Sequence, residues 1–152
     1  MSAAPHPIRV LLVDDDPAFA ELVTCVLELD GVTVVGHALD GAEGVELSRR
    51  LEPDVVLMDV RMPRMDGFEA TRRIVASSPA ARVLVVSSSK DPEDVERARE
   101  AGAVGYLSKD RATAELVQWI KQLHEPSSQA RERRIPSFRI RGWHGLRAAA
   151  QL

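Results

Sequence analysis

The sequence predicts an α/β fold in which a parallel sheet of five strands lies between two layers of helices. Short apolar runs alternate with segments whose apolar residues recur at helical spacing. Gly31, Pro53, Pro79 and Gly102 separate these segments, and such residues end helices or begin turns. Right-handed crossovers between parallel strands leave few topologies for this alternation. We therefore expect a doubly wound (βα)5 three-layer sandwich.

The first half of the chain predicts two strand–helix units. Pro17 suits the first turn of a helix, with Asp15 or Asp16 as its N-cap, and Asp40 can cap the next helix. The expected elements are a strand at 8–13, a helix from 17 to 31, a strand at 32–36 and a helix over 41–51. The apolar residues expected to face the sheet are Phe19, Leu22, Val23, Val26, Leu27, Ala42, Val45 and Leu51, with Cys25 packing beside them.

The second half continues the same alternation. Asp66 ends a loop before one helix, and Asp91-Pro92-Glu93 opens another that Gly102 ends. The expected strands are 55–58, 82–86 and 105–108. The expected helices are 67–77, 92–102 and a last helix that contains Leu116, Val117, Ile120 and Leu123.

Polar residues follow four of the apolar runs. Asp14-Asp15 follow the first strand, Asp59 the third, Ser87 the fourth and Lys109 the fifth. Parallel strand ends converge on one crevice, and the flavodoxin-like order 2-1-3-4-5 places strands one and three side by side. Carboxylates, a hydroxyl and an ammonium group at one rim indicate a site for a divalent cation and a phosphoryl group.

The four motifs in this order resemble the receiver domain of bacterial two-component response regulators. The resemblance covers residues 8–123. It rests on Val13-Asp14-Asp15-Asp16-Pro17, on the segment from Leu57 to Gly67 that contains Met58-Asp59-Val60, on Val85-Val86-Ser87-Ser88, and on the segment from Ala101 to Asp110 that contains Tyr106-Leu107-Ser108-Lys109.

The resemblance implies a phosphorylation chemistry. Asp59 would take a phosphoryl group from a phosphohistidine on a sensor histidine kinase or phosphotransfer protein. Mg²⁺, with Mn²⁺ as a substitute, would be held by Asp14, Asp15, Asp59 and the backbone carbonyl of Arg61, because hard oxygen ligands suit both ions. Ser87 and Lys109 would contact phosphoryl oxygens.

The resemblance also implies an output. Ser87 and Tyr106 would form a switch that changes the surface made by the fourth helix, fifth strand and fifth helix. That surface would bind a downstream protein or pair two phosphorylated copies. The receiver would assist its own phosphorylation and dephosphorylation without being a turnover enzyme.

Each residue also has a structural interpretation. The run Asp14-Asp15-Asp16 could be simply a helix cap with a favourable charge. Ser87 could be a loop hydroxyl, and Lys109 could be a surface charge. Their joint spacing favours the functional interpretation for all of these except Asp16, which we expect to be a cap. A static core role for Tyr106 is equally compatible with the sequence.

Three other functions compete with the phosphorylated receiver. A phosphohydrolase that forms an aspartyl-phosphate would typically carry an acid two residues after the nucleophile, where this chain has Arg61. A scaffold or adaptor independent of phosphorylation would need none of the pocket. The chain could also be the remnant of a DNA-binding regulator without its output domain. Asp110 follows Lys109 where the family usually has proline, as in the branch that carries helix-turn-helix output domains, so we expect a trans peptide bond there.

Charge and composition divide the chain into an extension (1–7), a receiver (8–125) and a basic tail (126–152). Residues 1–125 carry 14 Lys and Arg against 22 Asp and Glu, whereas the tail carries six Arg and one Glu. Nucleic-acid binding is therefore not expected of the receiver. One cysteine, the lack of a 20-residue apolar stretch and the lack of a signal-like N-terminus favour a cytoplasmic protein that does not span a membrane.

Overall fold

Five strands alternate with five helices in the computed structural model, which describes residues 6–123. The strands are β1 (Arg9–Val13), β2 (Thr33–Ala38), β3 (Val55–Met58), β4 (Arg82–Ser87) and β5 (Gly105–Ser108). The helices are α1 (Pro17–Leu29), α2 (Gly41–Leu51), α3 (Gly67–Ser77), α4 (Pro92–Ala101) and α5 (Lys109–Leu123). The expected basic tail (126–152) and most of the N-terminal extension lie outside the described residues.

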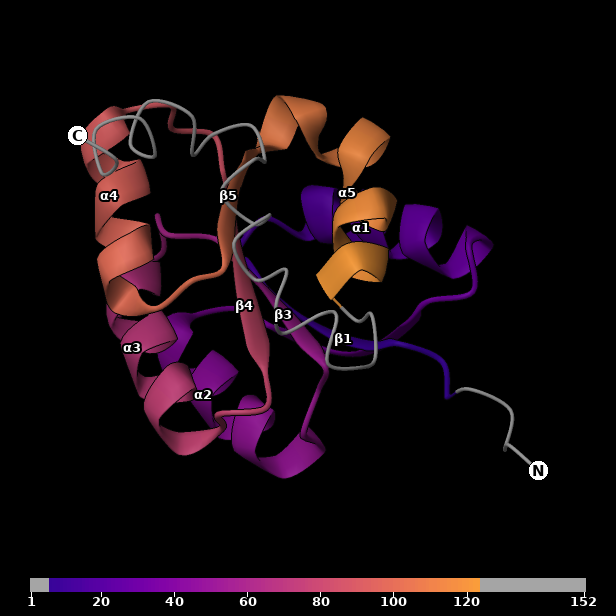
Figure 1. Ribbon diagram of the computed structural model, residues 1–152, viewed down its shortest axis with the longest axis horizontal. Coiled ribbons are helices and arrows are strands. Elements are labelled where there is room, and N and C mark those ends of the chain that lie inside the picture. Colours follow the sequence, from indigo (N-terminus) through magenta and orange to yellow (C-terminus); the bar gives the residue numbers. More distant parts are fainter. Residues whose placement is uncertain (1–5, 124–152) are drawn as a thin grey trace.

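The strands form one parallel sheet in the order β2-β1-β3-β4-β5, as the sequence predicts. Helices α1 and α5 cover one face of the sheet, and α2, α3 and α4 cover the other (Figure 1). The order reverses between β1 and β3, so the chain leaves these neighbouring strands toward opposite faces. The carboxyl ends of β1 and β3 therefore border an open crevice.

Both faces of the sheet are buried. On the side of α1 and α5, Leu12 and Leu57 of the sheet pack with Val23, Leu116 and other apolar side chains. On the side of α2 and α3, Leu11 and Met58 pack with Ile74. Strands buried on both faces explain the unbroken apolar runs in the sequence.

Aspartate side chains begin four of the helices. Asp16, Asp40, Asp66 and Asp91 are the N-caps of α1, α2, α3 and α4, and each accepts a backbone N–H from the first turn. These bonds satisfy donors that have no partner within the helix. The prediction that Asp16 is a cap is confirmed. The chain therefore carries two kinds of aspartate near strand ends, caps and pocket residues.

Some details of the sequence prediction are wrong. Strand β2 runs to Ala38 rather than to residue 36, because its pairing with β1 continues to Val13. Leu22 is 49% exposed and Cys25 is exposed, since α1 buries Ala20, Val23 and Leu27 instead. Further shifts are smaller: β1 begins one residue later and β4 ends one residue later than predicted.

Helix α2 turns the predicted Val45 and Leu51 toward the core, but not the predicted Ala42. Ala42 is exposed, whereas Gly41, Gly44 and Ser48 are buried. A Cβ added at Gly44 would lie 2.9 Å from methyl carbons of Val13, so small residues let this helix approach the sheet closely.

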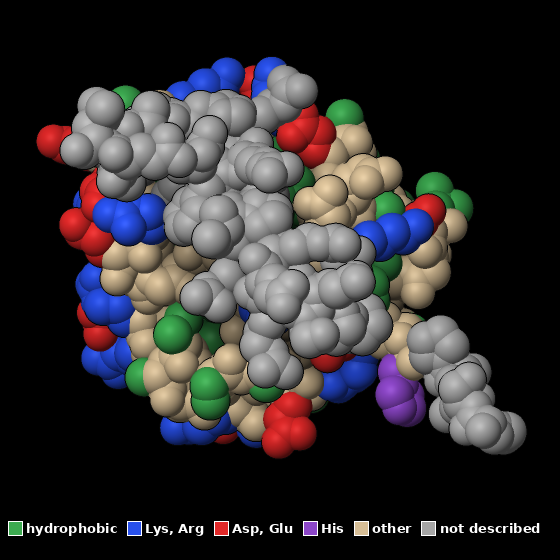
Figure 2. Space-filling model, in the orientation of Figure 1, with side chains coloured by type: hydrophobic (Ala, Val, Ile, Leu, Met, Phe, Trp, Pro, Cys, Tyr) green, Lys and Arg blue, Asp and Glu red, His purple; other side chains and the backbone are tan. Residues whose placement is uncertain are grey.

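The surface is charged and mixed in sign. Figure 2 shows acidic and basic side chains interspersed along the side formed by α3 and α4, where Glu69 pairs with Arg72 and Arg73. Within residues 6–123, no helix has the length and apolar content needed to span a membrane.

Candidate functional site

Three buried polar side chains lie at the carboxyl ends of neighbouring strands. Asp14 follows β1, Asp59 follows β3, and Ser87 is the last residue of β4; they are 6%, 5% and 0% exposed. Backbone hydrogen bonds fix the first two, because Asp14 N–H donates to the Ala38 carbonyl (3.0 Å) and Asp59 N–H donates to the Val13 carbonyl (2.9 Å). The sheet itself therefore sets where these side chains begin.

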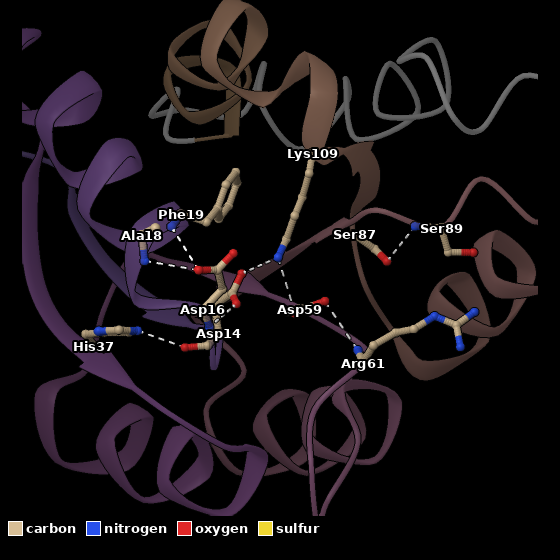
Figure 3. Close-up of polar contacts among 10 residues, drawn as sticks. All are labelled: Asp14, Asp16, Ala18, Phe19, His37, Asp59, Arg61, Ser87, Ser89 and Lys109. Carbon is tan, nitrogen blue, oxygen red and sulfur yellow. Dashed lines mark hydrogen bonds and ion pairs between the residues drawn. The ribbon is translucent and has the colours of Figure 1, made fainter.

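Lys109 brings a cation to the two aspartates. It is the first residue of α5, and its side chain extends toward the crevice (Figure 3). Its Nζ lies 2.9 Å from Asp14 Oδ2 and 3.5 Å from Asp59 Oδ2, and its side chain is 18% exposed. The Phe19 ring, with its centroid 4.6 Å from Nζ, flanks the ammonium group. The Lys109–Asp110 peptide bond is trans, as predicted.

The pocket is electrostatically frustrated around Asp59. Burial, and next the charge of Asp14, raise the pKa of Asp59 to about 6, although the Arg61 N–H and Lys109 act in the opposite direction. Burial lowers the pKa of Lys109, but the hydrogen bond and charge of Asp14 and the charge of Asp59 outweigh it and raise that pKa overall. One ammonium group thus faces more negative charge than it can neutralise.

An oxygen-rich cluster adds Asp15 to these residues. Carboxylate oxygens of Asp14, Asp15 and Asp59 lie within 4.8 Å of one another, and Asp15 is exposed at the mouth of the crevice. Carboxylate oxygens are ligands that Mg²⁺ and Mn²⁺ accept. The raised pKa of Asp59 indicates that a further cation would be accommodated electrostatically. The residues present therefore fit a hard divalent cation.

Ser87 and Tyr106 are both hydrogen-bonded to Ser89. Ser89 N–H donates to Ser87 Oγ (3.1 Å), and the Tyr106 hydroxyl donates to the Ser89 carbonyl (2.7 Å). Tyr106 is 2% exposed, and its burial raises the pKa of its hydroxyl. The two predicted switch residues therefore share one backbone segment, the loop after β4.

Arg61 contacts two neighbours, one through its backbone and the other through its side chain. Its backbone N–H donates to Asp59 Oδ1 (3.2 Å). Its guanidinium points away from Asp14 and Asp59 (Figure 3) and pairs with Asp94 Oδ2 of α4 (2.8 Å). From the sequence we expect its backbone carbonyl to bind the metal. Its side chain forms a contact that the sequence did not indicate.

Gly67 allows the loop of Asp59 to close against α3. A Cβ added there would collide with the Asp59 carbonyl oxygen and lie 2.6 Å from Cα of Val60. Because both neighbours are backbone atoms, the loop would have to move.

We expect Gly67→Ala to lower the free energy of unfolding by about 1–3 kcal/mol, as for other overpacked sites. Urea unfolding measures this change. Thr113→Ala, on the exposed side of α5, is the control and should stay within about 0.5 kcal/mol of the unmodified protein. An unchanged midpoint for Gly67→Ala would show that the loop yields freely.

Contacts of three residues near the site were not predicted from the sequence. Phe19 packs against the core, as predicted, and its ring also flanks Lys109. His37 Nε2 donates to the Asp14 carbonyl (2.8 Å) from the end of β2. Asp94 lies in the first turn of α4, where an acidic residue reads as a favourable helix charge. Helical periodicity gives the face of a residue but not its polar partners across the fold.

Comparison with known proteins agrees with this geometry. Residues 10–121 match the family model described as the response regulator receiver domain. The chain is 44% identical over 115 residues to the response regulator GacA of Pseudomonas viridiflava. The aligned region covers 75% of this chain and 54% of that protein. It therefore spans about half the length of that relative.

Two solved structures show the same fold. One is the signal receiver domain of the putative response regulator NarL from Mycobacterium tuberculosis, with 40% identity and a TM-score of 0.73, covering 76% of this chain and 94% of that one. The other is the CheX-CheY-BeF3-Mg+2 complex from Borrelia burgdorferi, with 26% identity and a TM-score of 0.74, covering 79% and 91%.

Proposed function

This chain belongs to the response regulator receiver domain family of two-component systems, and from that premise we propose that Asp59 is its phosphoacceptor. The observation that carries the proposal is the placement of Asp59. Its Oδ1 accepts the Arg61 N–H, whereas its Oδ2 faces Lys109 at 3.5 Å, so one carboxylate oxygen is held and the other faces the crevice. A histidine kinase or phosphotransfer protein would supply the phosphoryl group.

The residues around Asp59 have separate tasks in this reaction. Asp59 Oδ2 attacks phosphorus, the phosphorus–nitrogen bond of the phosphohistidine breaks, and the imidazole leaves with the bond electrons. Lys109 neutralises charge that develops on the phosphoryl oxygens. Ser87 accepts from Ser89 N–H, so its own hydroxyl hydrogen is available to a phosphoryl oxygen. The same pocket would later admit water for hydrolysis of the acyl phosphate.

The acidic cluster would hold Mg²⁺ or Mn²⁺ through Asp14, Asp15, Asp59 and the Arg61 carbonyl. When bound, the cation screens the repulsion between carboxylates and phosphoryl oxygens. The similar complex from Borrelia burgdorferi contains Mg²⁺ and BeF3, which supports the assignment. Asp14 also holds Lys109 at 2.9 Å, so this carboxylate orients the ammonium group.

The proposal is tested with phosphoramidate, whose phosphorus–nitrogen bond resembles that of phosphohistidine. Incubation with Mg²⁺ or Mn²⁺ should give a phosphorylated band on a phosphate-affinity gel that hydroxylamine removes, as expected of an acyl phosphate. The band should be absent in EDTA. A protein that stays unmodified with either cation, or an adduct that resists hydroxylamine, would contradict the proposal.

The output surface is proposed to be the face of α4, β5 and α5. Tyr106 of β5 lies beneath it, and the loop bonded to Tyr106 leads directly into α4. We expect phosphorylation to pair two copies through this face. Sedimentation velocity with Mg²⁺ and beryllofluoride should show a dimer that is missing without beryllofluoride; identical profiles would remove homodimerisation and leave a different protein as the target.

A regulatory role in transcription is a second proposal for the complete protein. The matched relatives include transcriptional regulators such as the probable NarL of Mycobacterium tuberculosis, of which this chain covers 53%. In this case the receiver would control a DNA-binding partner or domain. The alternative of a scaffold independent of phosphorylation predicts that Asp59→Ala leaves partner binding unchanged. A cytoplasmic location accompanies both proposals, because histidine kinases deliver phosphoryl groups from ATP.

A further inference from the structure

A network of polar contacts with two arms, which meet at Asp94, joins the phosphoacceptor pocket to the first turn of α4. Asp94 Oδ2 accepts from the Arg61 guanidinium (2.8 Å) and from Ser89 Oγ (2.6 Å). Arg61 N–H returns to Asp59 Oδ1 (3.2 Å), and Ser89 N–H returns to Ser87 Oγ (3.1 Å). The members of this network come from the ends of β3 and β4 and from α4, so the network connects segments that are far apart in the sequence.

Asp94 is buried, unlike the arginine that pairs with it. It is 7% exposed and its side chain 10%, whereas the Arg61 side chain that pairs with it is 64% exposed. A buried carboxylate that lost its partners would be strongly unfavourable, so Asp94 holds both Arg61 and Ser89 in place. The buried Asp94 therefore fixes the position of the exposed Arg61 side chain, and Arg61 does not fix the position of Asp94.

Each arm of the network fixes the orientation of a group that takes part in the proposed reaction. On one arm, the orientation of Arg61 keeps its N–H on Asp59 Oδ1 and leaves Oδ2 toward Lys109. On the other arm, Ser89 N–H occupies a lone pair of Ser87 Oγ, which directs the hydroxyl hydrogen elsewhere.

We propose that Asp94 is a positioning residue, which holds Asp59 and Ser87 in the geometry for phosphoryl binding and transmits phosphorylation to α4. The inference rests on the proposed function. When Ser87 turns its hydroxyl toward a phosphoryl oxygen, the Ser89 backbone follows, and the Ser89 hydroxyl moves against Asp94. Because such coupling is reciprocal, the position of Asp94 also affects the affinity of the pocket.

The test measures binding of beryllofluoride in the presence of Mg²⁺ by isothermal titration calorimetry. Asp94→Ala should bind about tenfold more weakly than the unmodified protein, and Asp94→Asn, which keeps the acceptor oxygen, should recover most of that loss. Arg61→Ala removes an exposed side chain and is the second variant should Asp94→Ala fail to fold. It should also weaken binding.

Asp91→Ala is the matched control. Asp91 caps the same helix three residues earlier and accepts from Glu93 N–H. Its backbone N–H donates to Ser89 Oγ (3.2 Å), a bond that alanine can keep, and its side chain lies outside the network. This variant should lose stability without losing affinity. Equal weakening in Asp91→Ala and Asp94→Ala, or an affinity within twofold of the unmodified protein for Asp94→Ala, would overturn the inference.

Hydrogen exchange gives an independent readout. Beryllofluoride should change the exchange rates of amides in the first turn of α4 in the unmodified protein; the change should be lost in Asp94→Ala and largely kept in Asp94→Asn, which retains the acceptor oxygen. The same response in all three proteins would overturn transmission through Asp94. An unmodified protein that binds no beryllofluoride would instead refute the proposed function, and the inference with it.

Discussion

Replacing Lys109 with alanine should slow phosphorylation of Asp59 by about 10²–10³-fold, the usual cost of removing one donor that stabilises developing charge. The ammonium group lies 2.9 Å from Asp14 Oδ2 and 3.5 Å from Asp59 Oδ2, where phosphoryl oxygens would enter. The measurement is the initial rate of adduct formation with a small-molecule phosphodonor at saturating Mg²⁺. Lys109→Arg keeps the charge and should recover part of the rate.

The same substitution should also destabilise the metal-free protein. Two carboxylates whose side chains are 8% and 6% exposed would lose their shared cation, at a cost of about 2–4 kcal/mol. Uptake of a proton by Asp59 limits the loss. Lys90→Ala is the control, because Lys90 and Asp110 form a pair on the surface with side chains 69% and 60% exposed. Equal rates and equal stabilities for Lys109→Ala and Lys90→Ala would contradict the role of Lys109.

Replacing Asp59 with asparagine should stabilise the metal-free protein at pH 7.5 by about 2–3 kcal/mol. Burial and the neighbouring Asp14 raise the pKa of Asp59 to about 6 from a usual value of 3.8, and each pKa unit corresponds to about 1.4 kcal/mol. The folded protein therefore binds the Asp59 proton more tightly than the unfolded chain. Asparagine fits the same space without the charge that burial disfavours.

The pH dependence has a definite sign. Between the unfolded pKa near 4 and the folded pKa near 6, the folded protein holds a proton that the unfolded chain has released, so rising pH removes stability from the unmodified protein. The difference between Asp59→Asn and the unmodified protein should be small near pH 4 and reach its full size above pH 7. Urea unfolding in EDTA across this range measures it.

Glu28→Gln removes an exposed carboxylate of α1 and serves as the control, with no comparable trend expected. Added Mg²⁺ should reverse the order at pH 7.5, because it binds the folded unmodified protein through the carboxylate that the variant lacks. A difference that is constant with pH, or that grows toward acid, would show that Asp59 is not destabilised by its surroundings.

The sequence predicts the fold and the pocket because both follow from local patterns. Strands buried on both faces read as apolar runs, and residues such as Asp14, Asp59 and Ser87 stand directly after them. Once the strands are parallel, their carboxyl ends meet at one edge, so Asp14 and Asp59, 45 positions apart, become neighbours without any detailed packing argument. Pro17 marks the first turn of a helix and so predicts a cap at Asp15 or Asp16, and the structure places the cap at Asp16.

Contacts between side chains of different elements could not be predicted in the same way. Helix α1 has apolar residues on several sides, so its pattern did not show that Leu22 and Cys25 face outward. The Arg61–Asp94 pair depends on how α4 lies over the loop after β3. Ser89, which connects Ser87 with Tyr106, depends on backbone geometry in a loop, where no periodicity exists.

Intact mass spectrometry tests most directly whether Asp59 accepts a phosphoryl group in this pocket. The unmodified protein, Asp59→Asn and the control Asp66→Asn, in which a helix cap is changed, are incubated with Mg²⁺ and acetyl phosphate. We predict one added phosphoryl group on the unmodified protein and on Asp66→Asn, none on Asp59→Asn, and none in EDTA. An adduct that persists in Asp59→Asn, or a protein that stays unmodified while Mg²⁺ binds, would contradict the account.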